Sequence, residues 1–315
     1  MVWLRRDSPD QRLNGMISIC IPIYNYDIRP LVKELRRQGD SCSVPIEIVC
    51  IDDGSNSHFV KLNQEVESIA TYKVLSENVG RAKVRNLFLQ HTQGEWLLFP
   101  DNDCKITSNN FIKNYAEQTL LDSDVIVGGR LYFTNCTDKN HRLRWLYGRN
   151  IESRHTAKER QEKPYRSFMT NNFLIRRDIL DQIPFDERLS GYGHEDTLFG
   201  YRLKQERIKI KHIDNPVEDG DIEDNTEFIH KTQEAIKNLV KIQQFLNDPE
   251  FDESVRLLRA YRKVEHFKIV WAVKLSHHLT KRCLEHKFVN GRGFSLQMFS
   301  FYKLGLLCEC LTASA

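Results

Sequence analysis

Short apolar runs that alternate with helix-like segments constrain the fold of this chain most. Four such runs fall early in the chain, at 16–25, 45–55, 71–77 and 95–103, and segments with helical spacing of apolar residues separate them. This alternation predicts an α/β fold, with a mainly parallel central sheet that helices cover on both faces. Polar residues follow each predicted strand, and in such sheets ligands bind beyond the carboxyl ends of the strands. We therefore expect a ligand site at that edge.

The second half of the chain has a less regular pattern. It predicts, in order, a strand at 123–133, a charged loop or helical insertion at 135–165, a strand running into a helix at 167–180, a glycine-rich loop, helix and strand at 185–210, a polar loop at 214–225, a helix at 226–246 and one long basic helix at 251–290.

Composition and charge exclude several classes of protein. The formal net charge is only +3, which argues against a dedicated nucleic-acid binder. Eight cysteines form no CxxC pair, so a reducing, cytoplasmic location is expected. The first fifteen residues lack an apolar leader, and no run approaches the roughly 20 apolar residues of a spanning helix.

The segment LLFPDNDC at 97–104 places two carboxylates directly after an apolar run. Asp101 and Asp103 are two residues apart, so in an extended segment they point to the same side. Two such carboxylates repel each other unless water solvates them or a cation lies between them. Mg²⁺ and Mn²⁺ bind carboxylate and phosphate oxygens together. The alternative is a solvated turn.

Three other motifs each allow a structural and a functional interpretation. Asp52 and Asp53 precede Gly-Ser, which fits a turn or a set of acceptors for a nucleotide. Gly80 begins a predicted helix on which Arg81 and Arg85 share a face, and these arginines either hold phosphate or fix acidic loops. The GYGHED motif at 191–196 places two acids in the first helical turn, where they suit the helix dipole or supply a general base.

The order of these motifs strongly resembles a family 2 glycosyltransferase with the GT-A fold. The resemblance covers roughly residues 16–245 and is carried by IPIYN, IDDGS, ENVGRAKVRN, FPDND, GGR, MTNNFLIRR and GYGHEDTLFGYRL. It implies a GT-A domain over 16–245, an N-terminal extension over 1–15 and a helical, basic C-terminal extension over 246–315.

The resemblance also implies roles for individual residues. Asp196 would be the general base and Glu195 would orient the acceptor. Asp103 and Asp101 would bind Mn²⁺ or Mg²⁺. Where the family often has a further histidine ligand, this chain has Asp219, and His212 is more plausibly structural than a substitute. The residues implied in binding the nucleotide sugar are Pro22, Tyr24, Asn25, Asp52, Asp53, Asn78, Gly80, Arg81, Asp101, Asn102, Gly129 and Asn172.

The function so implied is that of an inverting, metal-dependent glycosyltransferase. It would use a nucleotide-diphosphate sugar, UDP-linked, and a saccharide or lipid-linked saccharide acceptor. Asp219 motivates an alternative, a weakly active or inactive nucleotide-sugar-binding module of the same fold. A nucleotidyltransferase would need a glycine-rich triphosphate loop after the first strand, and IPIYNYDIRP supplies none.

The segment 251–315 carries a net charge of +6, whereas the rest of the chain carries −3. A basic helix that contains Trp271 predicts peripheral contact with an anionic membrane surface. The alternatives are packing on the catalytic domain or a homodimer.

Overall fold

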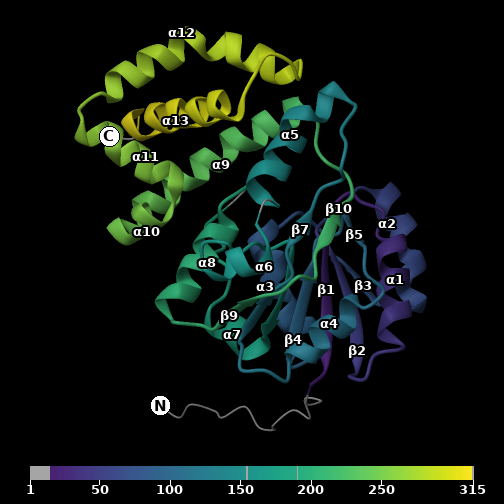
Figure 1. Ribbon diagram of the computed structural model, residues 1–315. Coiled ribbons are helices and arrows are strands. Elements are labelled where there is room, and N and C mark those ends of the chain that lie inside the picture. The colour runs from purple at the N-terminus through teal and green to yellow at the C-terminus, as the bar shows by residue number, and fades with distance from the viewer. Residues whose placement is uncertain (1–14, 154, 190, 314–315) are drawn as a thin grey trace.

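A computed structural model describes residues 15–153, 155–189 and 191–313 (Figure 1). The predicted N-terminal extension, apart from Gly15, lies outside the described residues. Seven strands form the central sheet in the order β3-β2-β1-β4-β8-β6-β9. Only β8 runs antiparallel to its neighbours, so the predicted mainly parallel sheet is confirmed. The strands are β1 (Ile17–Ile23), β2 (Ile46–Asp52), β3 (Thr71–Val74), β4 (Trp96–Pro100), β6 (Val125–Val127), β8 (Asn172–Arg176) and β9 (Ile210–His212).

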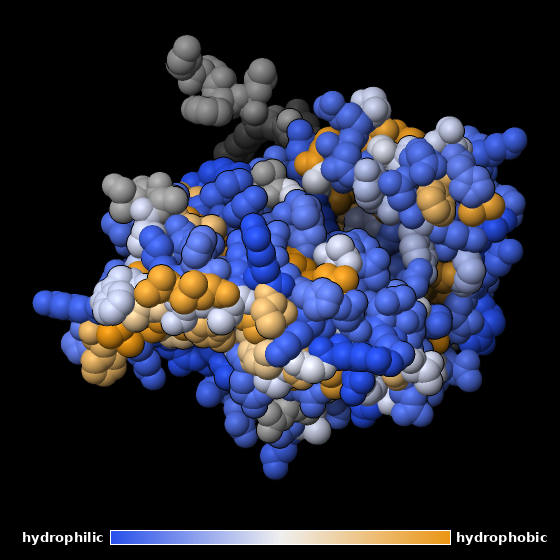
Figure 2. Space-filling view, turned by 90° about the horizontal axis from the view of Figure 1, so that it is seen from above, coloured by the Kyte–Doolittle hydropathy of each residue, from blue (hydrophilic) through white to orange (hydrophobic). Residues whose placement is uncertain are grey.

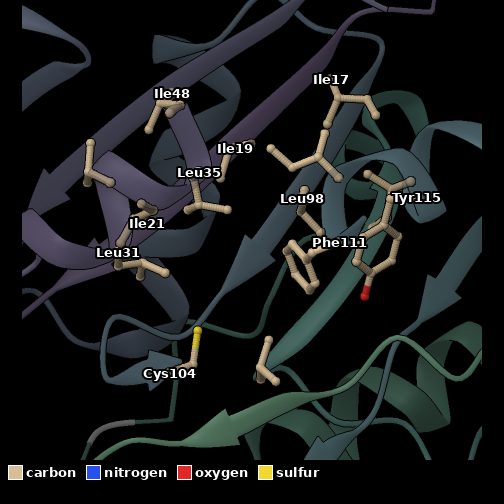
Figure 3. Close-up of a cluster of buried hydrophobic side chains, with 14 of the residues drawn as sticks. Ile17, Ile19, Ile21, Leu31, Leu35, Ile48, Leu98, Cys104, Phe111 and Tyr115 are labelled. Atoms are coloured by element: carbon tan, nitrogen blue, oxygen red, sulfur yellow. The ribbon is translucent and has the colours of Figure 1, made fainter. Parts of the chain in front are cut away.

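Helices cover both faces of this sheet because the buried strands are apolar on both sides (Figure 1). Ile17, Ile19 and Ile21 of β1 pack on one face against α1 (Arg29–Gly39) and α4 (Phe111–Gln118) (Figure 3). On the other face, Cys20, Val49 and Ile51 pack with α3 (Arg81–His91), α7 (Arg177–Gln182) and α8 (Glu195–Gln205). Each fully buried aliphatic side chain of this kind contributes about 1.5–3 kcal/mol.

A small second sheet lies beside the carboxyl ends of the main strands. It has the order β5-β10-β7, with β5 (Cys104–Ile106), β7 (Arg130–Leu131) and β10 (Val217–Asp219). The sequence predicted only a polar loop at 214–225, which was wrong for β10, because a strand of three residues with one apolar side chain has too little alternation to reveal it. This sheet holds the Asp101–Asp103 loop, since the N–H of Gly220 donates to the carbonyl oxygen of Asp103 at 3.0 Å.

The prediction of one long helix over 251–290 was wrong. The segment forms α10 (Pro249–Ser254), α11 (Arg256–His266) and α12 (Val270–Val289). Val255 is extended between the first two, and Lys268, with φ of 56°, turns the chain before the third. The backbone leaves the helical region at both places, and apolar periodicity alone does not locate such breaks.

The C-terminal helices pack on the α/β part of the chain through a shared apolar core. This core joins Leu198 and Tyr201 of α8 to α9 (Asn225–Leu246) and to residues of α10, α11, α12 and α13 (Leu296–Ala313). The packing alternative for the extension is therefore observed, and the core continues across the predicted 245/246 boundary. Among the residues that the structure describes, each helix is too short or too polar to cross a membrane. The remaining short helices are α2 (Ser57–Asn63), η1 (Gln64–Ser68), η2 (Lys139–His141), α5 (Arg142–Tyr147), η3 (Gly148–Glu152) and α6 (Ala157–Gln161).

Candidate active site

A cleft of about 960 Å³ opens at the carboxyl ends of β1, β2 and β4, which is where the sequence predicted a site. This volume is within the range of small-molecule sites. One wall comes from the loops after these strands and from the start of α3, and the other from β7, β10, α5 and α9. The predicted site residues that line it are Pro22, Tyr24, Asn25, Asp53, Asn78, Gly80, Arg81, Asp101, Asn102, Asp103 and Asp219.

Asp53 lies at one end of the cleft and caps α3. Its carboxylate accepts hydrogen bonds from the N–H groups of Val79, at 2.6 Å, and Gly80, at 3.0 Å. These N–H groups are therefore bonded within the chain rather than free for an anion. Burial raises the pKa of Asp53. Tyr24 lines the same cleft, and its exposed fraction is 53%.

Asp52, in contrast, has the structural role in a turn that the sequence also allowed. It is fully buried and lies outside the lining of the cleft. Its carboxylate accepts from the N–H of Ser55 at 2.7 Å and from the hydroxyl of Tyr72 at 2.8 Å. The hydroxyl of Ser55 in turn accepts from the N–H of Asn25 at 2.7 Å, so Asp52 connects the turn after β2 to the loop after β1.

Arg81 and Arg85 fix the acidic loops, which is one of the two roles considered for them. Arg81 lies 3.4 Å from the Glu195 carboxylate, and Arg85 lies 3.3 Å from that of Asp101. Arg85 is buried, while Arg81 is half exposed and stands over the ring of Tyr192. The two arginines therefore link the D-x-D loop to the start of α8.

Asp101 and Asp103 are both half-buried and line the cleft together. Burial and the carboxylates of Asp101 and Asp219 raise the pKa of Asp103 to about 7, although Arg130 opposes the rise. The N–H of Asp101 donates to the carbonyl oxygen of Asn171 at 2.9 Å, which extends the β4–β8 pairing into the loop. A cation would offset the cost of ionising both acids in this place.

Asp219, which we expected to bind the metal, pairs with arginine side chains in the structure. Its carboxylate is buried and lies 2.6 Å from the guanidinium of Arg130 and 3.6 Å from that of Arg144. Both arginines also pair with Glu152, at 3.5 and 3.2 Å. Asp219 therefore belongs to a buried network of alternating charges beside the cleft.

Two carboxylates remain as the protein donors for a metal. Within the described ranges, no group of three or more His, Cys, Asp or Glu side chains is close enough to hold a metal ion. Mg²⁺ sites that bind nucleotides commonly use only one or two carboxylates, with phosphates and water completing the coordination. Asp101 and Asp103 fit a site of that kind.

Glu195 and Asp196 begin α8 and are not among the residues that line the cleft, although Arg81 connects Glu195 to it. The two acids have opposite electrostatic environments. Burial raises the pKa of Glu195, but Arg81 and Arg85 outweigh this effect and hold it below the usual range. Burial and the neighbouring Glu195 charge raise the pKa of Asp196 to about 6. The Asp196 carboxylate accepts from the N–H of Thr197 at 2.6 Å. A carboxylate with a pKa in this range can accept a proton near neutral pH.

Gly129 and Asn172 lie beneath the cleft rather than in its lining. The amide of Asn172 is fully buried and donates to the carbonyl oxygens of Gly129, at 3.0 Å, and Asn215, at 2.9 Å. Its oxygen accepts from the hydroxyl of Tyr115 at 2.7 Å. His212 is also buried and bonded to the carbonyl oxygen of Pro164, as expected for a structural histidine.

Sequence reasoning missed several residues of the cleft wall. Arg130 and Tyr192 belong to the motifs GGR and GYGHED, so the sequence signal that could have identified them is their place in these motifs. Arg144, Lys231 and Glu234 lie on helices α5 and α9, and no sequence signal showed which helix face meets the cleft.

The chain resembles known glycosyltransferases in sequence. The family described as glycosyl transferase family 2 matches residues 18–184, more than half of the chain. A chondroitin synthase from Pasteurella multocida is 25% identical over 219 residues, which cover 59% of this chain and 23% of that protein. This chain thus spans about a quarter of that relative's length.

Two solved structures have a similar fold. A mannosyltransferase from Pyrobaculum calidifontis, solved with GDP-Man and Mn²⁺, has a TM-score of 0.53 at 14% identity and covers 95% of this chain and 85% of its own. Glucosyl-3-phosphoglycerate synthase from Mycobacterium tuberculosis, solved with Mn²⁺, UDP and glucosyl-3-phosphoglycerate, has a TM-score of 0.50 at 15% identity, covering 72% and 79%. The motif order, the mainly parallel sheet and the family match agree: the chain belongs to glycosyl transferase family 2 and has the GT-A fold.

Proposed function

We propose that the chain transfers a hexose or N-acetylhexosamine from a UDP-linked donor to a hydroxyl group of a saccharide or lipid-linked saccharide, in polysaccharide or glycoconjugate synthesis. The transfer inverts the anomeric configuration and depends on Mn²⁺ or Mg²⁺. One observation carries this proposal: Arg85 pairs with Asp101 of the D-x-D loop, and Arg81, which lines the same cleft, pairs with Glu195 at the start of α8. The predicted division into a catalytic domain over 16–245 and an extension over 246–315 is part of it.

The nucleotide occupies the end of the cleft formed by the loops after β1 and β2. Tyr24 stacks on the base, and the side chains and backbone of the neighbouring loops contact base and ribose. Asp53 is bonded to the start of α3 through both carboxylate oxygens, so it offers the ligand their remaining lone pairs. The residues assigned to this end are Pro22, Tyr24, Asn25, Asp53, Asn78, Gly80, Arg81 and Asn102.

Asp101 and Asp103 hold the divalent cation together with the donor's phosphates. When bound, the cation neutralises the diphosphate and stabilises it as a leaving group. Asp219, which the sequence suggested as a third ligand, instead fixes Arg130 beside Asp103. The Arg130 guanidinium lines the cleft and adds positive charge next to the diphosphate.

Asp196 takes the proton from the acceptor hydroxyl as that oxygen attacks the anomeric carbon from the side opposite the diphosphate. Its raised pKa makes it a better base than an exposed aspartate. Glu195 stays ionised because Arg81 and Arg85 are near, and it accepts a hydrogen bond from the acceptor to orient it.

Calorimetric titration with UDP, GDP, CDP and dTDP, with and without Mn²⁺, tests this proposal. We expect one nucleotide, UDP, to bind, and its affinity to rise with Mn²⁺. Transfer assays with UDP-sugars and saccharide acceptors then follow. Binding of no nucleotide would refute the proposed site, whereas metal-dependent UDP binding without transfer to any acceptor would identify a binding module.

The predictions of a cytoplasmic location and of a homodimer stay predictions. The prediction of peripheral membrane contact through the C-terminal extension also stays a prediction.

A further inference from the structure

Helix α12 and the turn before it expose a stripe of large apolar side chains. Trp271, Leu275 and Leu279 are four residues apart, so they share one face of the helix, and their exposed fractions are 68%, 53% and 73%. Phe267 and Ile269 extend the stripe into the preceding turn, with exposed fractions of 69% and 44%. Figure 2, seen from the end of the molecule that carries α12, shows a band of hydrophobic residues along one side. Such a patch marks an interaction surface.

The surroundings of this apolar stripe are strongly basic. Lys268 precedes α12, and the helix itself carries Lys274, Lys281, Arg282 and Lys287. The single acid in its sequence is Glu285, whose carboxylate accepts from the hydroxyl of buried Tyr302 at 2.7 Å. Lys268 and Arg282 are exposed. Lys281 lies 3.7 Å from the carboxylate of Glu309 on α13, which offsets part of this positive charge. The stripe is therefore an apolar surface along a helix that carries more cations than acids.

We infer that the α12 stripe docks on an anionic lipid surface. Apolar and aromatic side chains on one face, with lysine and arginine beside them, form the pattern of a helix that lies in the membrane interface. Anionic headgroups complement the basic residues. A second copy of the chain fits this face poorly, because a symmetric contact through α12 would bring the same cations together.

The position of α12 connects this surface to the cleft. Val289, its last residue, lines the cleft, and its carbonyl oxygen accepts from the Asn225 side chain at 3.1 Å. Ten residues of helix separate Val289 from Leu279, which is about 15 Å at the usual helical rise. A lipid-anchored saccharide below the stripe is thus within reach of the cleft. This step, which makes the acceptor lipid-linked, rests on the proposed function, whereas the docking itself does not.

Vesicle flotation with the full chain tests the docking. We expect binding to vesicles of phosphatidylglycerol and phosphatidylcholine in equal parts, weaker binding to phosphatidylcholine alone, and loss of binding at high salt. Trp271→Gln, Leu275→Gln and Leu279→Gln together should lower vesicle affinity at least about tenfold. Leu120→Gln with Leu121→Gln is the matched control, because both leucines are exposed away from α12.

The readouts separate this inference from the proposed function. UDP titration of the α12 variant should match that of the unsubstituted chain, which also shows that the variant is folded. Unchanged vesicle binding in that variant would overturn the inference. So would a dimer in analytical ultracentrifugation that the same substitutions dissociate, since the stripe would then be a subunit interface. If the unsubstituted chain does not bind UDP, the proposed function is refuted, whereas the vesicle experiment still tests the docking.

Discussion

Replacing Asp219 by Asn tests whether this carboxylate belongs to the charge network or to a metal site. In the structure it lies 2.6 Å from Arg130 and 3.6 Å from Arg144, and the side chains of Asp219 and Arg144 are almost entirely buried. Asparagine keeps the shape and removes the charge. If the network is the function of Asp219, the substitution should destabilise the protein when no metal is present.

The magnitude follows from burial and from the partners that remain. Removing one partner of a buried ion pair costs about 3–5 kcal/mol when the other charge is left uncompensated. Arg130 and Arg144 would each keep Glu152, at 3.5 and 3.2 Å, so the cost should fall toward the lower end. We expect a loss of about 3 kcal/mol in the free energy of unfolding.

Urea unfolding, followed by far-UV circular dichroism in the presence of EDTA, measures this loss. Asp221→Asn is the matched control, because Asp221 is exposed, lies two residues away and also lines the cleft. The control should change stability by less than about 0.5 kcal/mol. An Asp219→Asn protein that is as stable as the control, or more stable, would refute the network role and favour a metal ligand whose charge is unpaired without the ion.

The other predictions concern catalysis, metal binding and a residue beneath the cleft. Asp196→Asn should lower transfer at least about a hundredfold without changing UDP affinity. Equal loss of both would remove Asp196 from the role of base. Because burial and Glu195 raise the pKa of Asp196 to about 6, and the base must be ionised, kcat/KM should fall as pH drops through about 6; a profile flat down to pH 4 would contradict this. Asp103→Ala should make UDP affinity insensitive to Mn²⁺ and EDTA, and a retained metal effect would show that other residues hold the ion. Asn172→Ala should lose about 2–3 kcal/mol of stability, measured by urea unfolding, because the Tyr115 hydroxyl and two carbonyl groups lose their partner. Stability close to the unsubstituted protein, with lost UDP binding, would instead support the original assignment of Asn172 to the donor site.

The sheet was predictable from sequence because its strands are continuous apolar runs bounded by polar residues. Ile17–Ile23 and Trp96–Pro100 are buried on both faces, and such runs have few alternative structures. The breaks between α10, α11 and α12 were not predictable, because they depend on two backbone positions, Val255 and Lys268, within a segment of helical composition. Tertiary packing selected those breaks, and single-sequence periodicity carries no information about it.

At the site, the positions of the carboxylates were predictable from the sequence, whereas their hydrogen-bond and ion-pair partners were not. Strand ends placed Asp53, Asp101 and Asp103 at one edge, as parallel topology requires. The division between Asp52, which is used inside the turn, and Asp53, which faces the cleft, depends on Tyr72 and Ser55. The pairing of Asp219 with Arg130 depends on β10 lying beside β7, and neither strand was resolved as a separate element from the sequence.

Partners within the chain also distinguish the acids that support the fold from those available for chemistry. Glu195 is buried, yet two arginines lower its pKa. Burial raises the pKa of Asp103 to about 7 and that of Asp196 to about 6. Arginine contacts at Asp103 and the backbone hydrogen bond at Asp196 offset only part of this effect of burial. Ionising either one in the free protein therefore costs free energy that a ligand can recover. In the proposed function, a divalent cation at Asp103 and the acceptor hydroxyl proton at Asp196 are the two positive partners.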